Sequence, residues 1–347
     1  MIWYRTVVHP VALGSEETVR QIGDANRLIL HFEAVDWVCA CYINGQFAGV
    51  HVGHQSLIRR AVALAKECDT VIFAGGLNHD FDSEGYDRTT LTLPYEQDAL
   101  IGELLAVRPD TVIVLYAGSP VAMPWNEQAK AVLWSYYAGM EGGTAIAEIL
   151  FGKENPSGRL AESFPKDAND CPAHTIGTFA KKDVVEYKEG VMVGYRYYDT
   201  VDTPLYYGFG HGLSYSRFVY KYMTVRPVTA SAETGGTMDA PRYELAVTVK
   251  NDSLRTGKEV VQVYVAPKER QDDRPAHELR AFEKVELMPG EEKTVKLLLT
   301  AEAFSVYDEK QHAFAEKTGS YEIEVGSSSR DIRLRREREH FLSHPGR

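Results

Sequence analysis

Residues 71–88 read Val-Ile-Phe-Ala-Gly-Gly-Leu-Asn-His-Asp-Phe-Asp-Ser-Glu-Gly-Tyr-Asp-Arg, an apolar run that gives way to a polar loop. The run from Thr70 to Ala74 ends at the pair Gly75-Gly76, and a short continuous apolar run is typical of a buried parallel strand. In open α/β sheets, ligands bind in crevices at the carboxyl ends of the strands. The stretch therefore predicts an α/β sheet with a candidate site in the loop that follows this strand.

This loop is rich in carboxylates: Asp80, Asp82, Glu84 and Asp87 lie close together, and Arg88 follows directly. Polar residues are common in loops, so the spacing is compatible with a solvated acidic loop that an Asp–Arg pair braces. It is also compatible with a binding or catalytic site. The residues alone leave both interpretations open.

Predicted helices and strands alternate through the following part of the chain. Apolar residues at helical spacing predict a helix over 56–67, and Pro94 opens a second helix that ends at Val107. The all-apolar run Thr111–Tyr116 predicts a second strand, residues 128–134 a further element, and residues 142–151 a third helix. This alternation predicts a parallel sheet with helices on both faces.

The segment Pro156–Ser216 is rich in Gly, Pro, Tyr and Phe, which predicts a long connecting loop. Aromatic rings can stack on the apolar face of a sugar, but they also fasten a long loop onto a domain because they combine large area with few rotamers. We expect most of the tyrosines here to serve the second purpose: Tyr187, Tyr195, Tyr197, Tyr198, Tyr206, Tyr207 and Tyr215.

Residues 217–334 show short alternating runs at regular spacing, which predict a β-sandwich of about seven strands. The clearest runs are Tyr243–Lys250, Glu259–Val265, Phe282–Leu287, Lys293–Leu299 and Tyr321–Val325. Residues 335–347 carry many charges, and we expect them to form a frayed tail.

Residues 1–54 predict a short β fragment. Residues 27–38 alternate between apolar and polar side chains, and the runs Cys39–Ile43 and Gln46–Val50 flank Asn44-Gly45. Two β runs on either side of Asn-Gly are a strong signal for a hairpin. We expect this fragment to lie apart from the α/β sheet.

Composition excludes several functional classes. The formal net charge of −11 argues against nucleic acid as a partner, because phosphates attract a basic face. No apolar run approaches the roughly 18 residues of a membrane-spanning helix. Cys39, Cys41, Cys68 and Cys171 lack the spacing of a metal site and are expected to be free thiols, which, with no signal peptide after Met1, predicts a cytoplasmic protein. No motif for a metal or a cofactor occurs.

Four ordered motifs resemble family 3 of the glycoside hydrolases, the β-glucosidase family. They are Ala-Gly-Gly-Leu-Asn with Asp-Ser-Glu-Gly-Tyr-Asp-Arg in residues 74–88, then residues 139–160, Val-Gly-Tyr-Arg-Tyr-Tyr-Asp at 193–199, and Gly-Phe-Gly-His-Gly-Leu-Ser-Tyr at 208–215. The resemblance runs from about Leu57 to about Leu334. It implies an (α/β) sandwich domain with its connecting loop over 55–216, followed by a fibronectin type III-like domain over 217–334.

Residues 1–54 resemble a different domain, the sugar-binding jelly roll of family 2 glycoside hydrolases. The resemblance rests on Trp3-Tyr4-Arg5, on residues 30–37 and on residues 42–53. A jelly roll has about eight strands, so only a fragment of one would be present. A hairpin that packs on the next domain is the alternative, and the first strands of the family 3 sheet are expected to be absent.

The family 3 resemblance also implies a chemistry. Retaining glycosidases use two carboxyl groups about 5 Å apart, one as nucleophile and one as acid/base. Glu84 takes the acid/base position, Asp80 and Asp82 face the sugar or the solvent, and Asp87 with Arg88 braces the loop as a pair. No metal or cofactor is implied.

The nucleophile of the family is an aspartate on a (β/α)8 barrel, and a barrel needs about 250 residues. No stretch of this sequence fits such a barrel, so two hypotheses follow. In the first, the chain is the C-terminal part of a β-glucosidase-like hydrolase that acts on a β-glucoside or oligosaccharide, with a barrel-containing chain as partner. In the second, it is an inactive carbohydrate-binding or structural remnant. The apolar edge that missing strands would leave predicts self-association.

Overall fold

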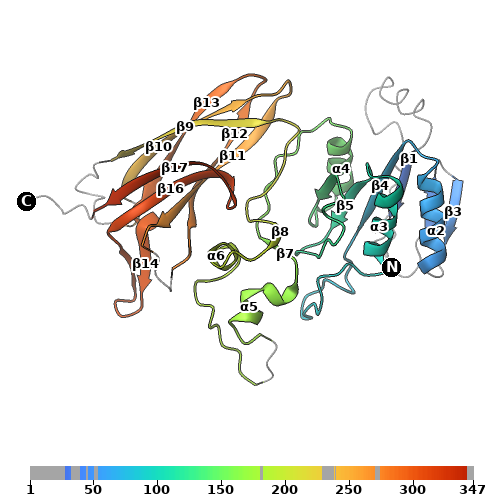
Figure 1. Ribbon diagram of the computed structural model, residues 1–347, viewed down its shortest axis with the longest axis horizontal. Coiled ribbons are helices and arrows are strands. Elements are labelled where there is room, and N and C mark those ends of the chain that lie inside the picture. Colours follow the sequence, from blue (N-terminus) through green and yellow to red (C-terminus); the bar gives the residue numbers. More distant parts are fainter. Residues whose placement is uncertain are drawn as a thin grey trace, which may run out of the picture. The chain divides into compact units, whose positions relative to one another are not determined.

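The computed structural model describes residues 28–32, 40–43, 46–50, 54–179, 183–228, 238, 240–269 and 274–341. The chain divides into two compact units, Met1–Glu154 and Asn155–Arg347 (Figure 1). The described helices are too short or too polar to cross a lipid bilayer.

The first unit is built on a parallel sheet. Its strands stand in the order β1-β4-β5-β6, and each neighbouring pair is parallel. The bounds are β1 Leu28–Phe32, β4 Thr70–Gly76, β5 Val112–Tyr116 and β6 Ala131–Trp134. The parallel sheet predicted from the apolar runs is therefore confirmed.

One face of this sheet packs on α4 (Gly142–Leu150). Ile72, Ala74 and Val114 form an apolar cluster with Ile146 and Leu150 of that helix. The helix α4 thus forms one of the two layers that cover the sheet.

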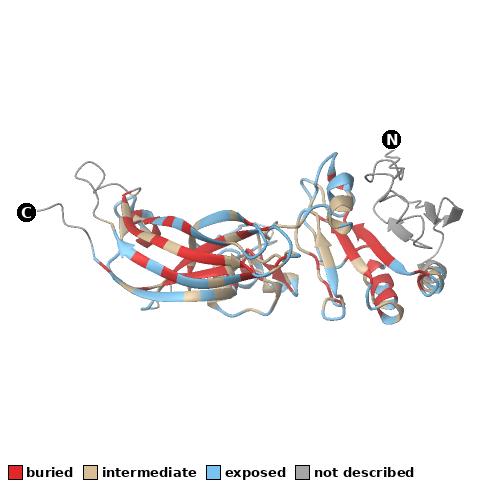
Figure 2. Ribbon diagram, turned by 90° about the horizontal axis from the view of Figure 1, so that it is seen from above, coloured by how far each residue is buried: buried red, intermediate tan, exposed pale blue. Residues whose placement is uncertain are grey.

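The opposite face carries α2 (His54–Ala65) and α3 (Gln97–Val107) (Figure 1). Successive side chains of a strand point to opposite faces, so Phe73 and Ile113 lie on this side, and both are fully buried. Leu100, Ile101 and Leu104 of α3 are buried as well. The strands β4 and β5 are thus covered on both faces, as Figure 2 shows.

The position of β1 corrects an expectation from the sequence. Leu28–Phe32 was expected in a separate β fragment, but β1 pairs in parallel with β4, with Leu28 opposite Thr70 and Phe32 opposite Ala74. Its sequence, Leu-Ile-Leu-His-Phe, is nearly continuous in apolar residues, which suits a parallel strand better than an alternating antiparallel one. The expected absence of a first strand from this sheet is wrong.

The hairpin predicted at Asn44-Gly45 is confirmed, because β2 (Ala40–Ile43) and β3 (Gln46–Val50) pair antiparallel. The two turn residues, Cys39 and Trp3-Tyr4-Arg5 lie outside the described residues. The resemblance of residues 1–54 to a family 2 jelly roll stays a prediction.

The second unit contains a β-sandwich. One sheet has the order β13-β10-β9 and the other β12-β11-β16-β17, and each neighbouring pair is antiparallel. The bounds are β9 Phe218–Pro227, β10 Pro241–Asn251, β11 Gly257–Pro267, β12 Glu278–Leu287, β13 Glu292–Thr300, β16 Gly319–Ser328 and β17 Asp331–His340. The predicted sandwich is confirmed.

Alternating apolar side chains fill the space between these two sheets. Val247 and Leu297 of the first sheet and Val263 and Val325 of the second belong to one buried cluster. A turn of 3-10 helix, Ala301–Phe304, adds Phe304 to it. A small hairpin of β14 (Ser305–Asp308) and β15 (Ala313–Glu316) follows.

The strand β17 reaches farther than the sequence predicted. Arg335 and the residues up to His340 were expected in a frayed tail, yet Arg335 lies opposite Glu324 and His340 opposite Gly319 in the ladder with β16. Positively and negatively charged residues alternate near the end of this strand. Arg335 contacts Glu322 and Glu324. An exposed edge strand tolerates such charges, which explains why composition alone suggested a tail.

The connecting segment from Asn155 to Ser216 belongs to the second unit. Its short elements are β7 (Phe164–Pro165), the 3-10 turn Ala168–Asp170, α5 (Pro172–Thr175), α6 (Tyr195–Thr200) and β8 (Leu205–Tyr207), and β7 pairs with β8. The backbone of Leu160 pairs with the far end of the segment: its N–H donates to His211 O, and its carbonyl accepts from Gly210 N, both at 2.8 Å.

One of the aromatic residues of this segment, Tyr195, fastens it to the sandwich. The ring of Tyr195 stacks on Phe209 with centroids 4.5 Å apart and meets the edge of Tyr264 at 6.2 Å. Tyr198 is buried, whereas Tyr187 and Tyr215 are exposed.

Candidate active site

The loop after β4 begins at a glycine that no other residue could replace without a clash. Gly76 has φ +141°, and a Cβ there would lie 1.8 Å from the carbonyl oxygen of Tyr116. The next residue continues this contact, since Leu77 N donates to Tyr116 O at 2.8 Å. The end of β4 is therefore pinned to the end of β5 before the loop starts.

A buried glutamine also holds this glycine. Gln97 is fully buried at the start of α3; its Oε1 accepts from Gly76 N at 2.8 Å, and its Nε2 donates to Gly76 O at 2.9 Å. The side-chain amide thus acts like a neighbouring strand and satisfies both polar groups of the residue. Tyr95 and Glu96, just before it, adopt left-handed conformations with φ 59° and 57°.

The first turn of the loop is fixed by Asn78 and Tyr95. The carbonyl of Asn78 accepts from Phe81 N at 3.0 Å and from Asp82 N at 2.9 Å. Its side-chain Nδ2 donates to the hydroxyl of Tyr95 at 3.3 Å, and the ring of Phe81 meets Tyr95 edge to face at 5.3 Å. The strained turn before α3 therefore supports the acidic loop.

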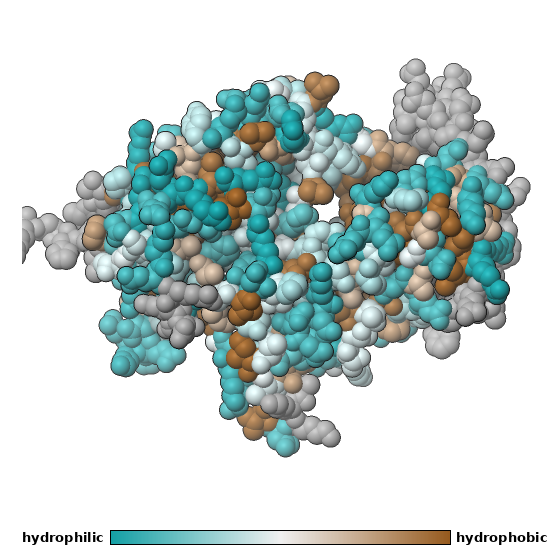
Figure 3. Space-filling model, in the orientation of Figure 1, coloured by the Kyte–Doolittle hydropathy of each residue, from teal (hydrophilic) through white to brown (hydrophobic). Residues whose placement is uncertain are grey.

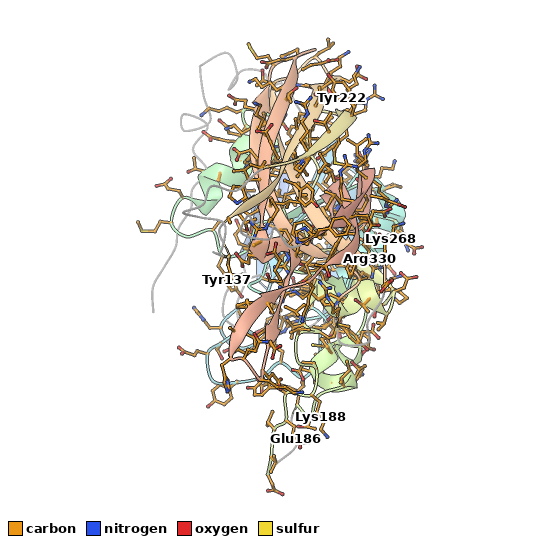
Figure 4. The ribbon with its side chains drawn as sticks, turned by 90° about the vertical axis from the view of Figure 1, so that its left-hand side faces the viewer. Tyr137, Glu186, Lys188, Tyr222, Lys268 and Arg330 are labelled. Carbon is orange, nitrogen blue, oxygen red and sulfur yellow. The ribbon has the colours of Figure 1, made fainter. Side chains whose placement is uncertain are left out.

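Asp82 contacts two other loops. Its Oδ2 accepts from the hydroxyl of Tyr137 at 2.8 Å and from Gly118 N at 3.1 Å. Gly118 follows β5 and Tyr137 follows β6 (Tyr137 is labelled in Figure 4). Partial burial and the contact with Asp82 raise the pKa of Tyr137 to about 12, so its hydroxyl stays protonated and donates.

Arg88 anchors the other end of the loop, but its partners differ from the prediction. Its Nη1 donates to Ser119 Oγ at 3.0 Å and to Pro120 O at 2.9 Å. Among the described residues no ion pair joins Arg88 to Asp87, so the predicted loop pair does not form. Burial lowers the pKa of the Arg88 guanidinium, and the nearby Asp82 and Tyr137 partly offset this effect.

Glu84 lies between these two anchors and is exposed. Within the part of the chain that the structure describes, its carboxyl group makes no hydrogen bond or ion pair. The side chains of Asp80 and Asp87 are exposed too, and Tyr86 is 85% exposed. Of the predicted site residues, the structure therefore brings Asp82 and Arg88 onto neighbouring loops and leaves Glu84, Asp80 and Asp87 open to solvent.

Sequence reasoning missed Tyr137, Gly118 and Ser119, which hold the loop. The available signal was their place in the chain, because each follows a predicted strand, and carboxyl ends of parallel strands meet at one edge of the sheet. Only Asp82 and Arg88 were recognised from this network.

The structure also bears on metal ligands, on cysteines and on glycosylation. In the described residues no group of His, Cys, Asp and Glu is arranged to hold a metal ion. Cys171 is a free thiol. Asn251-Asp-Ser matches the acceptor pattern for N-glycosylation, but Asn251 is fully buried and its Nδ2 donates to the carbonyls of Arg255 and Leu287, so the amide is not accessible.

The second unit contains its own buried ionic cluster around His277. The ring lies 2.7 Å from Glu324 Oε2 through Nδ1 and 3.2 Å from Asp199 Oδ2 through Nε2. Arg330 donates from Nε to Asp199 Oδ1 at 2.6 Å (Arg330 is labelled in Figure 4). Burial opposes the charged ring, but the hydrogen bonds to Asp199 and Glu324 outweigh it and raise the pKa of His277 to about 9.

Comparison with known proteins identifies two domain families in this chain. The family described as glycosyl hydrolase family 3 C-terminal domain matches residues 5–215, and a fibronectin type III-like domain matches residues 259–329. The thermostable beta-glucosidase B of Acetivibrio thermocellus is 41% identical over 281 residues, which are 81% of this chain and 36% of the relative. An exo-alpha-(1->6)-L-arabinopyranosidase of Bifidobacterium breve is 41% identical over 278 residues, 80% of this chain and 35% of that protein.

Solved structures of beta-glucosidases also resemble this chain. A GH3 beta-glucosidase of Bifidobacterium adolescentis matches with a TM-score of 0.76 and 38% identity, over 83% of this chain and 41% of that one. A beta-glucosidase of Kluyveromyces marxianus in complex with glucose matches with a TM-score of 0.75 and 36% identity, over 85% and 34% of the two chains. The chain spans about a third of the length of the curated relatives named above.

Proposed function

The chain belongs to glycoside hydrolase family 3, and on this premise we propose that it supplies the acid/base side of a retaining β-glycosidase. Glu84 is the proposed acid/base residue. The observation that carries this proposal is the position of Glu84 between two anchors, Asp82 and Arg88, with its own carboxyl exposed and free of protein partners among the described residues. A group that exchanges protons with a substrate must be accessible and held in place.

In the proposed mechanism, Glu84 protonates the glycosidic oxygen as the bond to the sugar breaks. It then removes a proton from the water that attacks the covalent glycosyl-enzyme intermediate. The second carboxylate, the nucleophile, comes from a segment outside these 347 residues. The share of the relatives that this chain spans, about a third, supports that origin.

The proposed substrate is a glycoside with a pyranose ring, with a β-glucoside or a β-linked oligosaccharide as the first choice. Three of the compared proteins are named beta-glucosidases, and one is named an arabinopyranosidase. The compared proteins thus differ in the sugar that they are named for, so the glycone has to be measured for this chain.

The proposed partner is a barrel-bearing protein segment, with a second copy of the chain as the alternative. Around α5 the second unit exposes a series of apolar side chains, which Figure 3 shows along the same segment: Ile176, Phe179, Val184, Val185, Val191 and Val193. Exposed apolar clusters of this kind are typical of surfaces that another protein covers. The free thiol of Cys171 supports the cytoplasmic location that we propose.

A second candidate function is carbohydrate binding without turnover. It is favoured by the exposure of Glu84, whose carboxyl group has no charged or hydrogen-bonding partner among the described residues. Without a nucleophile, a two-carboxylate mechanism loses most of its rate and retains little beyond binding.

The test uses two preparations. The first is the purified chain with an aryl β-glucoside, with and without Glu84→Gln. Turnover that Glu84→Gln abolishes would mean that a nucleophile lies within this chain, and it would contradict that part of the proposal. No turnover by either protein agrees with an external nucleophile.

The second preparation is a hybrid in which this chain replaces the matching third of the Acetivibrio thermocellus relative. We expect the hybrid to hydrolyse aryl β-glucosides, and we expect Glu84→Gln to abolish turnover of phenyl glucoside while 2,4-dinitrophenyl glucoside suffers far less, because that leaving group needs little protonation. Equal loss on both substrates would contradict the acid role. A folded but inactive hybrid that still binds glucose would favour the second candidate.

A further inference from the structure

We infer that Asp82 and Tyr137 are positioning residues, which hold the Glu84 loop in place for the reaction, and that Asp82 is not a sugar ligand. The inference rests on the proposed acid/base role of Glu84. The contacts that carry it, however, join this loop to two other loops, those after β5 and β6, and can be tested without turnover.

The first observation is the way in which Asp82 is occupied. One carboxylate oxygen, Oδ2, accepts from both the Tyr137 hydroxyl and the Gly118 N–H, at 2.8 and 3.1 Å. These donors lie in the loops after β6 and β5, so one side chain joins the ends of three neighbouring strands. A sugar hydroxyl would compete with two donors already in place.

The second observation is the space around Gly118. A Cβ at this position would lie 2.9 Å from Tyr137 Cε2 and 3.1 Å from Asp82 Oδ2. Its φ does not fall in the left-handed region, so the backbone conformation does not require glycine. Glycine is required instead because Tyr137 and Asp82 approach this position so closely.

The third observation is backbone strain beside Tyr137. Tyr136 has φ 50°, a left-handed conformation that is uncommon for a residue other than glycine. Ser135 holds the backbone on its other side, because its N–H and its hydroxyl both donate to Leu115 O, at 3.0 and 3.1 Å. Such strain persists where the surrounding contacts fix it, and it is often found at functional sites. Here it brings the next residue, Tyr137, to Asp82.

The result is a loop that is held on both sides of Glu84. Asp82 is joined to Tyr137 and Gly118, and Arg88 is joined to Ser119 and Pro120. An acid/base carboxyl must lie within hydrogen-bond reach of the glycosidic oxygen, and a shift of about 1 Å can reduce the rate by about 100-fold. Because Glu84 has no contact of its own with the described residues, its position depends on these anchors.

The first test measures amide hydrogen exchange in the 347-residue chain. We expect Tyr137→Phe and Gly118→Ala to raise exchange in a peptide covering residues 79–90 by about 10-fold or more, since each weakens a hydrogen bond to a charged acceptor. Asp87→Asn is the matched control, because the structure shows no hydrogen bond or ion pair between this neighbouring carboxylate and any described residue, and we expect it to leave exchange unchanged. Unchanged exchange in both Tyr137→Phe and Gly118→Ala would overturn the inference.

A pair of substitutions at Asp82 tests the role of its oxygen. Asp82→Ala removes the acceptor, whereas Asp82→Asn keeps one side-chain oxygen that can accept from Tyr137 and Gly118. We expect Asn to restore most of the protection that Ala removes. If both variants exchange equally fast, the shared acceptor is not what holds the loop.

The chemical test uses the hybrid described above and two leaving groups. We expect Tyr137→Phe to lower kcat for phenyl glucoside about 10- to 100-fold, with little change in KM and less than about 3-fold change for 2,4-dinitrophenyl glucoside. A rise in KM on both substrates at unchanged kcat would instead identify Asp82 as part of the sugar site. Glu84→Gln separates the two proposals, because it should alter turnover and leave exchange unchanged. If Glu84→Gln alters neither turnover nor exchange, the acid role of Glu84 fails. The exchange rates of the Tyr137 and Gly118 variants still test whether these residues hold the loop.

Discussion

Arg159 and Glu259 form a buried ion pair, with Nη2 2.5 Å from Oε1 and side chains only 10% and 6% exposed. The pair joins the connecting segment to strand β11, and the same Glu259 oxygen accepts from Val260 N at 2.7 Å. Both charges lie out of water, so each depends on the other for compensation. The contact is therefore a sensitive point for the stability of the second unit.

We expect Glu259→Gln to reduce the free energy of unfolding by about 3–5 kcal/mol, because it leaves the Arg159 charge buried and uncompensated. The matched control is Glu286→Gln, which breaks the exposed pair that Glu286 forms with Lys258, the residue beside Glu259, at 3.7 Å. A pair so exposed should change stability by less than about 1 kcal/mol. Denaturant unfolding of the two variants measures the difference, and equal effects would contradict the importance of burial.

His277 predicts an alkaline limit to stability. Its pKa is raised from 6.5 to about 9 in the folded chain, so the folded state binds a proton that the unfolded state releases at lower pH. The stabilisation is fully present below the unfolded pKa, and it is lost as the pH rises from about 6.5 through 9. We expect the melting temperature to fall over this interval, and His277→Gln to remove that part of the slope.

His211 provides the control for this experiment. Burial lowers the pKa of His211, and the nearby Arg159 acts in the same direction, so this ring is neutral where His277 is charged. His211→Gln should therefore keep the alkaline slope, whatever it does to the melting temperature itself. A slope that disappears in both variants would show that His277 is not its source.

Gly76 and Gly102 should respond to alanine in opposite directions. At Gly76, a Cβ meets the Tyr116 backbone at 1.8 Å and φ is +141°, so Gly76→Ala should displace the end of β4 and cost several kcal/mol, in the range of about 4 or more. At Gly102, inside α3, no atom lies within 4 Å of the added Cβ. Gly102→Ala should raise stability by about 0.8–1 kcal/mol. Thermal unfolding of both variants is sufficient to check the signs.

Gln97 allows an isosteric test of the contact with Gly76. Gln97→Glu keeps the shape of the side chain but replaces the Nε2 donor with an oxygen that faces Gly76 O. We expect a loss of about 3–5 kcal/mol at neutral pH, because the substitution places an uncompensated negative charge in a fully buried site. Glu103→Gln, an exposed position on the same helix, should leave the free energy of unfolding unchanged. An equally small effect of Gln97→Glu would contradict the importance of the hydrogen bonds between Gln97 and Gly76.

Local patterns predicted much of this fold. The apolar runs of β4 and β5 identified buried parallel strands, because both of their faces are covered and nearly every position is apolar. The Asn44-Gly45 pair located a hairpin, and the period of two identified the strands of the sandwich. Each of these signals lies within one short stretch of sequence.

Long-range pairing could not be predicted in the same way. Nothing within Leu28–Phe32 specifies that it pairs with β4 rather than with the nearby hairpin, because the partner is more than 35 residues away. The contact between Asp82 and Tyr137 spans 55 positions, and a carboxylate looks the same in sequence whether it faces sugar or a tyrosine. Arg88 was assigned to its neighbour Asp87 because adjacency is the information that a sequence offers.

The backbone pairing of Leu160 with Gly210 and His211 has a consequence for how this family can vary. It brings the two ends of the excursion over residues 161–209 together at one point of the second unit. A flexible loop with fixed ends becomes only slightly harder to close as it lengthens, at about 0.6 kcal/mol for each doubling. The parts of this stretch that do not pack on the sandwich, as Tyr195 and Asp199 do, can therefore gain or lose residues in evolution, while the strands on either side keep their register.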